Sequence, residues 1–210
     1  TAGVAAGGFN DPNGAYHSTE EYGGSSWTAG EDLGTGRYGA GCAGILTAGL
    51  FFGGSDVSPA FSVATEEYDG TDWTAGGNLT SGRRGLAGAG LQTAGLAFGG
   101  DEPGASDKTE EYDGSSWTAG NTLNTGRDNI SGAGIQTAAL AFSITKTELY
   151  DGTSWVTQPN MATSRFYLAG CGTTTAGLAF GGNPGPGTSN ATEEFTPEST
   201  TETGSTIDFD

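Results

Sequence analysis

The sequence predicts an all-β fold built from five similar units. Near-copies of Thr-Ala-Gly-Leu-Ala-Phe-Gly-Gly recur along the 210 residues and alternate with near-copies of Thr-Glu-Glu-Tyr, at a period of 38 to 46 residues. A period of this length is typical of proteins that repeat one supersecondary unit. No stretch carries a sustained apolar period of 3.6 residues, so helices are not expected. The two motifs begin at Thr1, Thr47, Thr93, Thr137 and Thr175, and at Thr19, Thr65, Thr109, Thr147 and Thr192.

The spacing within each unit is constant except at one connection. Trp lies 8 residues after the Thr of Thr-Glu-Glu, Arg lies 10 residues after Trp, and the next Thr-Ala lies 10 residues after Arg. The length varies only between Gly-Gly and the next Thr-Glu-Glu, from 10 residues after Gly54 to 2 residues after Ile144. Insertions confined to one connection predict a loop on one face of a rigid scaffold.

Each unit divides into four short segments with the character of strands. In the unit after Arg83, residues 86–90 are rich in Gly and Ala, and residues 93–100 alternate between bulky and small side chains. Residues 109–112 and 115–118 flank an Asp-Gly pair, which is a strong hairpin signal because both residues tolerate a positive φ. A single unit of four strands cannot bury its own two faces and has to pack against its neighbours. Such a unit is therefore predicted to be one blade of a β-propeller.

The number of units predicts the number of blades. Five strands of the Gly-Gly type predict five blades of four antiparallel strands, and a ring of four blades with extra terminal strands is the alternative. The chain opens on a second strand, so the first blade is expected to lack an inner strand of its own. A single propeller domain is expected over residues 1–210, with blades at about 1–30, 37–76, 83–120, 127–158 and 165–210.

The order of the motifs resembles a known family. Arg, an inner strand, a hydrophobic strand ending in Gly-Gly, Glu-x-Tyr-Asp and then Trp resemble the kelch repeat of galactose-oxidase-like propellers. The near-identity of the units is similar to that of repetitive propellers encoded by marine phages and related environmental sequences. The pattern departs at Ser143-Ile144, which replaces Gly-Gly, at Phe195, which replaces Tyr, and at Thr200, which replaces Trp.

The resemblance implies both a mode of closure and a location. Kelch-like rings often close by pairing strands from both termini, and residues 205–209 have the apolar/polar alternation of such a closing strand. The resemblance to phage propellers implies a surface component of a virion, such as a tail, fibre or decoration protein. The expected location is therefore extracellular or on the virion surface.

The composition disfavours several classes of partner. With 25 acidic and 7 basic residues, the formal net charge is −18, so phosphate would be repelled and nucleic-acid binding is not expected. No run of about 18 apolar residues is present, so no membrane span is expected. Cys42 and Cys171 are expected to be free, buried small residues, and a disulfide between them is the alternative.

The sequence offers little for catalysis. Galactose oxidase needs copper held by several Tyr and His ligands, which the only histidine, His17, cannot supply, and zinc sites of His and Cys fail for the same reason. A Ser-His-Asp triad would have to use His17 and lacks an accompanying Gly-x-Ser-x-Gly turn. We therefore predict a non-enzymatic protein without metal or cofactor. An extracellular carbohydrate-active enzyme of the galactose-oxidase or sialidase type is the alternative.

Residues that recur in every unit are expected to be structural. A catalytic carboxylate pair needs two unlike environments at one location, so of each Glu pair we expect one in a structural contact and the other in solvent. The arginines are expected to bond carboxylates or carbonyls between blades, and the Trp and Tyr rings to pack there. These positions are Trp27, Trp73, Trp117, Trp155, Arg37, Arg83, Arg127, Arg165, Tyr22, Tyr68, Tyr112 and Tyr150.

The variable connections are the predicted recognition surface. In an up-down blade, the second-to-third connection lies on the same face as the segments that precede each Arg. Variable loops on a constant scaffold fit recognition, although unconstrained drift would give the same pattern. The expected partners are surface glycans or other structural protein chains, and the alternative is a homo-oligomer or filament formed through terminal strands. The candidate binding residues are Phe9, Asn10, Asp11, Tyr16, His17, Phe61, Asp101, Glu102 and Lys108.

Overall fold

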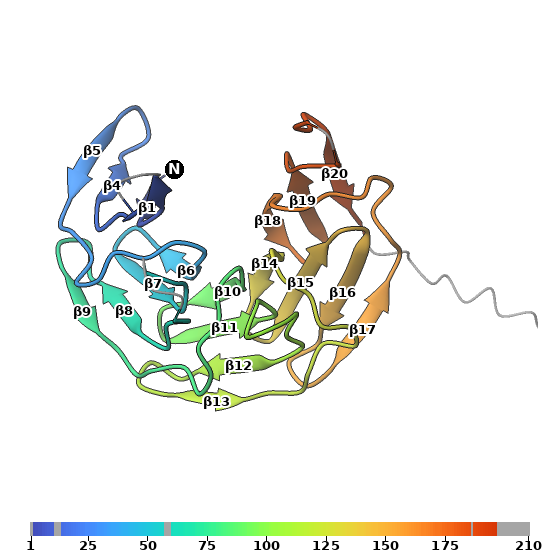
Figure 1. Ribbon diagram of the computed structural model, residues 1–210, viewed down its shortest axis with the longest axis horizontal. Helices are drawn as coiled ribbons and strands as arrows, with labels where there is room; N and C mark the ends of the chain where they lie inside the picture. Colours follow the sequence, from blue (N-terminus) through green and yellow to red (C-terminus); the bar gives the residue numbers. More distant parts are fainter. Residues whose placement is uncertain (1, 11–13, 57–59, 186, 197–210) are drawn as a thin grey trace, which may run out of the picture.

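The computed structural model is all-β and describes residues 2–10, 14–56, 60–185 and 187–196. Five antiparallel sheets of three or four strands, with one small hairpin, form the five blades of a β-propeller (Figure 1). No helix occurs in these ranges. The prediction of an all-β fold with five blades is confirmed, and the alternative of four blades is wrong.

The strands of each blade follow one another in chain order from the centre of the molecule outward (Figure 1). Blade 1 contains β1 (Gly3–Ala6), β4 (Thr19–Tyr22) and β5 (Trp27–Gly30), and the loop between β1 and β4 holds β2 (Phe9–Asn10) and β3 (Gly14–Ala15). Blade 2 contains β6 (Gly41–Ile45), β7 (Ala48–Phe52), β8 (Thr65–Tyr68) and β9 (Trp73–Ala75). Blade 3 contains β10 (Ala87–Leu91), β11 (Ala94–Phe98), β12 (Thr109–Tyr112) and β13 (Trp117–Ala119). Blade 4 contains β14 (Ser131–Ile135), β15 (Ala138–Ser143), β16 (Lys146–Tyr150) and β17 (Trp155–Gln158), and blade 5 contains β18 (Ala169–Thr173), β19 (Ala176–Phe180) and β20 (Thr192–Phe195).

The blades form an arc that is open between blade 1 and blade 5 (Figure 1). The inner strands β6, β10, β14 and β18 lie side by side around the centre. Blade 1 begins with β1, and the described ranges place no strand on the inner side of it, as the sequence predicts. In the described part of the chain, no backbone hydrogen bond joins blade 1 to blade 5. The expected closing strand, residues 205–209, lies outside the described residues.

Glycine allows the inner strands to approach one another closely. A Cβ atom on Gly88 of β10 would lie 2.3 Å from the Cys42 carbonyl oxygen of β6, and one on Gly132 of β14 would lie 2.4 Å from the Phe98 ring. No side chain fits at these two positions. This crowding explains why the Gly/Ala-rich segment of each unit is the innermost strand.

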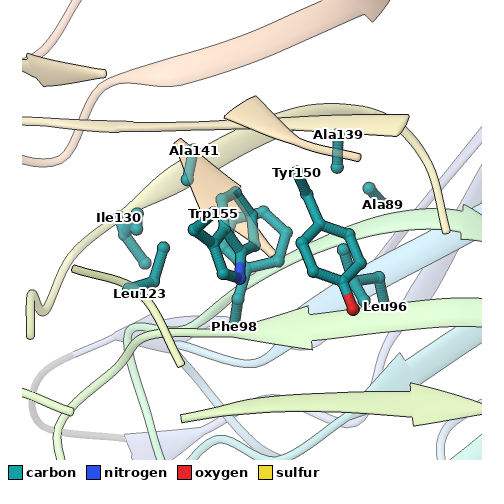
Figure 2. Close-up of a cluster of buried hydrophobic side chains, with 10 residues drawn as sticks. Ala89, Leu96, Phe98, Leu123, Ile130, Ala139, Ala141, Tyr150 and Trp155 are labelled. Carbon is teal, nitrogen blue, oxygen red and sulfur yellow. The ribbon is translucent and has the colours of Figure 1, made fainter. Parts of the chain in front are cut away.

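The hydrophobic core lies between neighbouring blades. Figure 2 shows the cluster in which Phe98 and Leu96 of blade 3 pack against Trp155 and Tyr150 of blade 4. The ring centroids of Phe98 and Trp155 are 5.0 Å apart. Each blade therefore completes its burial only against a neighbour, which is the energetic pattern of repeat proteins.

Candidate functional site

The repeated arginines connect consecutive blades. The Arg83 carbonyl accepts a hydrogen bond from the Gly54 amide of blade 2 at 2.7 Å, and its guanidinium donates to Glu110 Oε1 of blade 3, also at 2.7 Å. Burial lowers the pKa of Arg83, while the charge of Glu110 opposes that shift. Both side chains are buried, so each charge has its counter-charge inside the protein. The corresponding pairs are Arg37–Glu66, Arg127–Glu148 and Arg165–Glu193.

The second glutamate of three Thr-Glu-Glu motifs also has a structural role. In three cases it accepts a hydrogen bond from the tyrosine hydroxyl of the following blade; the pairs are Tyr68–Glu21, Tyr112–Glu67 and Tyr150–Glu111. For these three glutamates the expectation of a solvated side chain is wrong, because the tyrosine packed into the next blade requires an acceptor for its hydroxyl. Glu194, which faces no such tyrosine in the described structure, is exposed as expected. Burial, followed by the hydrogen bond to glutamate, raises the pKa of Tyr68 and of Tyr112 to about 12.

The repeated tryptophans fill sockets in the preceding blade. Trp117 donates from Nε1 to Thr65 Oγ1 at 2.9 Å, and its ring centroid lies 4.8 Å from that of Phe52. Trp155 makes the same two contacts with the equivalent Thr and Phe of blade 3. Trp73 also donates to a threonine of the preceding blade. These contacts tie the outermost strand of one blade to the middle strands of another.

Trp27 and Tyr22 of blade 1 have no preceding blade in the described part of the chain. Trp27 is 53% exposed, whereas Trp117 and Trp155 are each 5% exposed. The expectation that Trp27 packs between blades is therefore wrong. Its ring lies against Tyr22 of its own blade, with a centroid separation of 5.2 Å. Blade 1 thus presents two aromatic rings at an open end of the arc.

The joint between blades 4 and 5 replaces both members of the Tyr–Glu pair. Leu149 stands at the glutamate position and Phe195 at the tyrosine position, and both pack against the same apolar cluster. A tyrosine facing Leu149, or a glutamate facing Phe195, would leave a polar group without its partner. The departure from the repeat at Phe195 is therefore one half of a paired change.

The variable connections gather on one face, here called the loop face. It comprises the described parts of residues 7–18, 53–64, 99–108, 144–145 and 181–191, with the residue that follows each repeated arginine. Backbone bridges join Tyr38 to Ser55 and Arg84 to Asp101. Each blade-to-blade connection is thus bonded to the base of a variable loop. The loops differ in their tips but rise from the same backbone framework.

A strip of five side chains crosses the loop face from blade 1 to blade 3. The ring centroids of Phe9 and Tyr38 are 4.9 Å apart, and Arg84 Nη1 donates to the Tyr38 hydroxyl oxygen at 3.1 Å. The Arg84 guanidinium lies 5.5 Å from the centre of the Phe61 ring, and its Nε lies 3.4 Å from Asp101 Oδ2. The hydrogen bond with Tyr38 raises the pKa of Arg84, whose guanidinium lies between aromatic rings and is paired with the Asp101 carboxylate.

The remaining predicted residues of the first loop make local contacts. Asn10 Nδ2 donates to the Tyr16 hydroxyl oxygen at 2.7 Å, and both side chains are exposed. His17 Nδ1 lies 3.0 Å from the Leu33 carbonyl oxygen, a contact that holds the loop to the next connection. Asp11 lies outside the described residues. The structure therefore places Phe9, but not His17, in the strip.

The predicted residues of the third loop form a separate polar cluster. Lys108 Nζ donates to Glu102 at 2.8 Å, and Ser81 and Ser106 also donate to this carboxylate. Burial raises the pKa of Glu102, but the hydrogen bonds from Lys108 and the two serines outweigh it and lower the pKa overall. Because its charges are already paired, this cluster supports the loop and offers little binding energy to a partner.

Sequence reasoning missed the residues directly after the repeated arginines. The segments before each arginine were expected to contribute to this face, whereas the structure places Tyr38 and Arg84 at the centre of the strip. The sequence did contain a signal for these residues, because the position directly after each constant arginine differs from unit to unit. Its occupants are Tyr38, Arg84, Asp128 and Phe166.

Tyr167, two residues after the repeated Arg165, has a strained backbone conformation. Its φ is 54°, and the equivalent positions Gly39 and Gly85 have φ values of 63° and 61°. A tyrosine in this left-handed region is uncommon, and such residues cluster at functional sites. The ring is 69% exposed, so internal packing does not account for it.

A central cavity of about 620 Å³ lies beside β1 and the inner strands. Cys42 and Cys171 both line it, and both are free and exposed, so the expectation that they are buried is wrong. They face this open space because the inner strands turn one side toward the centre of the arc. The described lining consists of small and apolar residues, without charged groups to orient a ligand. The loop face is therefore the stronger candidate site.

The described residues show neither a metal site nor a membrane-spanning helix. Among the described residues, no group of three or more His, Cys, Asp or Glu side chains is arranged to hold a metal ion. Within the same ranges, no helix has the length and apolarity that crossing a membrane requires. Comparison with models of protein families and with curated proteins gives no match for this chain.

Proposed function

We propose that this protein is a non-enzymatic β-propeller module that binds its partner through the loop face. The kelch-like repeats and their resemblance to phage propellers support a role on the virion surface, as a tail, fibre or decoration protein. The proposed partners are surface glycans or other virion proteins. The observation that carries the proposal is the strip of Phe9, Tyr38, Phe61, Arg84 and Asp101, which variable positions build on a constant framework.

The chemistry of the strip suits recognition. Aromatic rings and arginine are the side chains that most often dominate binding energy, because they bury large areas and still make polar contacts. Phe9 is 54% exposed, and the Arg84 side chain is 42% exposed, so both are accessible to a partner. Their mutual contacts hold them in place before binding, which reduces the entropy lost on association.

The distribution of positive charge also favours this face. Four of the seven basic residues are the buried repeated arginines. The other three are Arg84 and Lys108 on the loop face, and Lys146, which directly follows the connection 144–145. The hairpin turns at the other end of the strands carry acidic residues such as Asp113. Arg84 and Lys108 are each paired with a carboxylate of the same face, Asp101 and Glu102, so the loop face offers a partner charges of both signs.

The recurring acids support a module without catalysis. In each Arg–Glu pair, the first glutamate also accepts a hydrogen bond from a backbone amide, as Glu66 does from Gly34 at 2.7 Å. The second glutamate accepts from a tyrosine in three blades. The recurrence of the Thr-Glu-Glu motif is therefore explained by the hydrogen bonds and ion pairs that its glutamates make between blades.

Assembly with other chains is a second candidate function. The inner edge of β1 is unpaired in the described structure, and Trp27 is exposed on β5, the outer strand of the same blade. Unpaired strand edges are templates for pairing with another chain. The loop face and the open ends of the arc are separate surfaces, so variants can test the two functions independently.

The first prediction concerns loop exchange. Residues 101–108 are replaced by the two-residue connection Thr145-Lys146, which removes Asp101 and the third loop. Folding should persist, because the Lys146 carbonyl accepts from Arg127 as the Lys108 carbonyl accepts from Arg83, and because changes in loop length cost little closure entropy. Binding to an array of neutral, sulfated and sialylated glycans, or to purified virion proteins, should fall by at least about tenfold.

Two matched variants complete this test. Arg84→Ala should reduce binding as the exchange does, whereas Thr71→Ala, in an exposed hairpin turn away from the loop face, should leave it unchanged. Circular dichroism and thermal unfolding report whether each variant folds. Undiminished binding by folded loop-exchange and Arg84→Ala proteins would refute the loop face as the recognition surface.

A further inference from the structure

The joint between blades 4 and 5 contains an open socket. A cavity of about 180 Å³ there is lined by residues that include Phe142, Thr147, Met161 and Ala179. These four residues occupy the positions that surround a tryptophan in other joints. The equivalents around Trp117 are Phe52, Thr65, Leu79 and Ala97, and those around Trp155 are Phe98, Thr109, Leu123 and Ala141.

The polar end of the socket is also preserved. In three joints the threonine hydroxyl accepts a hydrogen bond from a tryptophan Nε1 at 2.9 Å. Thr147 occupies this position in blade 4, and its hydroxyl has no hydrogen-bond partner among the described residues. The open site therefore has apolar walls and a hydroxyl acceptor at the place where an indole N–H is held elsewhere, and Asn160, Glu193 and Glu194 also line it.

The strand edge beside the socket is free as well. β20 pairs with β19 on one side, and its other edge has no strand in the described structure. In blade 3, the fourth strand pairs with the third so that Trp117 stands opposite Tyr112. Phe195 of β20 is the equivalent of Tyr112 and lines the cavity. A strand added antiparallel to β20 would thus place its central side chain in the socket.

We propose that this socket binds a tryptophan on an extended segment of a partner protein, which adds to β20 as the fourth strand of blade 5. The partner segment resembles Ser-Ser-Trp-Thr-Ala-Gly, which this chain carries at residues 25–30 and 115–120. The three filled joints share this chemistry: an indole whose N–H reaches a threonine hydroxyl, carried on a backbone in β conformation. The residue of this chain at the corresponding sequence position is Thr200, which lies outside the described residues and carries no ring. This interaction is distinct from the proposed binding at the loop face.

A labelled peptide tests the proposal with the full chain. The probe is a fluorescein-labelled peptide of residues 113–120, and its binding is followed by fluorescence anisotropy. The same peptide with Trp117→Ala should bind about 100-fold more weakly, since truncation of a buried aromatic anchor has effects of this size. In the protein, Thr147→Val should weaken binding about 5- to 10-fold, because it removes the acceptor for the indole N–H.

A second pair of protein variants distinguishes peptide binding in the socket from non-specific binding elsewhere on the surface. Ala179 lines the socket, so the larger side chain of Ala179→Leu should fill it and abolish binding. Ala176 lies at the exposed end of the same strand, so Ala176→Leu should leave binding unchanged. Equal binding of the Trp and Ala peptides would overturn the proposal, as would undiminished binding by folded Ala179→Leu protein. If the peptide binds only after residues 197–210 are removed, the chain fills its own socket and the partner strand is ruled out.

Discussion

Tyr167 illustrates how one residue departs from the repeat at an energetic cost. The equivalent residues Gly39 and Gly85 adopt a positive φ without strain, whereas a tyrosine side chain disfavours that conformation by about 1–3 kcal/mol. Because the ring is exposed, the strain is not offset by burial in the described structure. The same reasoning applies to Ile144, a β-branched residue with φ 59° where the repeat otherwise has glycine.

Replacing Tyr167 with glycine should therefore stabilise the protein. We expect Tyr167→Gly to raise the free energy of unfolding by about 1 kcal/mol, because relief of strain exceeds the added entropy of the unfolded chain. The measurement is urea unfolding followed by circular dichroism. Phe166→Gly is the control, since Phe166 has no positive φ and should lose stability. A lower stability of Tyr167→Gly would show that the exposed ring makes contacts that outweigh the strain.

The inter-blade tyrosines give a further prediction, for alkaline pH. The folded pKa of Tyr68 and Tyr112 is about 12, above the ordinary value of 10.0. Because the raised pKa favours the protonated form in the folded state, the associated stability is present below pH 10 and is lost as pH rises to about 12. Each tyrosine steepens this loss by up to about 1.4 kcal/mol per pH unit.

Thermal unfolding of Tyr68→Phe and Tyr112→Phe proteins between pH 9 and pH 12 measures this effect. Each variant should be less stable than the parent at pH 9 and should lose stability less steeply above pH 10. Tyr22→Phe is the matched control, because the Tyr22 hydroxyl donates to the Gly24 carbonyl in its own blade and bonds no glutamate. Parallel pH profiles for all four proteins would contradict the assignment.

At the scale of the element, each blade is held by contacts that its neighbour provides. The Arg–Glu pair lies at the base of the loops, and the Trp–Thr and Tyr–Glu bonds lie along the middle and outer strands. The joints between blades are similar, and where one residue of a joint departs from the repeat, a residue that faces it changes as well. Between blades 1 and 2, Ala6 replaces the phenylalanine of the socket, and Phe51 of blade 2 packs at 6.1 Å from Trp73 instead. Between blades 4 and 5, Leu149 and Phe195 change together.

Two tryptophans at equivalent positions should differ in their contribution to stability. Trp117→Ala should lower the free energy of unfolding by about 3–5 kcal/mol, because it empties a buried socket. Trp27→Ala should lower it by less than about 1 kcal/mol, because Trp27 is exposed at the end of the arc. Chemical unfolding of both variants checks the contrast. A large loss in Trp27→Ala would show that another surface covers this ring in solution.

The whole molecule behaves as a short linear array with two ends. Blade 3 has a neighbour on each side, whereas blade 1 and blade 5 each have one in the described structure (Figure 1). In repeat proteins, stability is close to a sum of unit and nearest-neighbour terms, so end units open more easily than central ones. The open arc thus predicts a gradient of stability along the chain.

Hydrogen exchange measured by mass spectrometry should reveal this gradient. The amides of β11 in blade 3 should be the most protected, and those of β1 and β19 should exchange at least about tenfold faster. The reason is that opening an end blade breaks one inter-blade joint, whereas opening blade 3 breaks two. Uniform protection across the five blades would indicate that the arc closes into a ring or that its ends are covered by other chains.

Local patterns in the sequence are enough to predict the all-β content, the five blades and the position of the variable loops. These features depend on local alternation, on the Asp-Gly turns and on the constant spacing of the repeat, all of which act over a few residues. The tertiary structure decided which recurring residues are buried and which are exposed. The Tyr–Glu and Trp–Thr bonds join residues 39 to 54 positions apart, so their existence depends on how the blades pack.

The candidate sites, too, could be predicted only in part from the sequence. The alternation of constant and variable segments was enough to locate the loop face. Only the packing of blades 1 to 3 places Tyr38 and Arg84 between Phe9 and Phe61. The exposure of Trp27 and the open socket at Thr147 likewise depend on which blades have neighbours. Each repeat carries the residues that form a joint with the next blade. Whether that joint is occupied depends on which blade lies next to it in the folded protein.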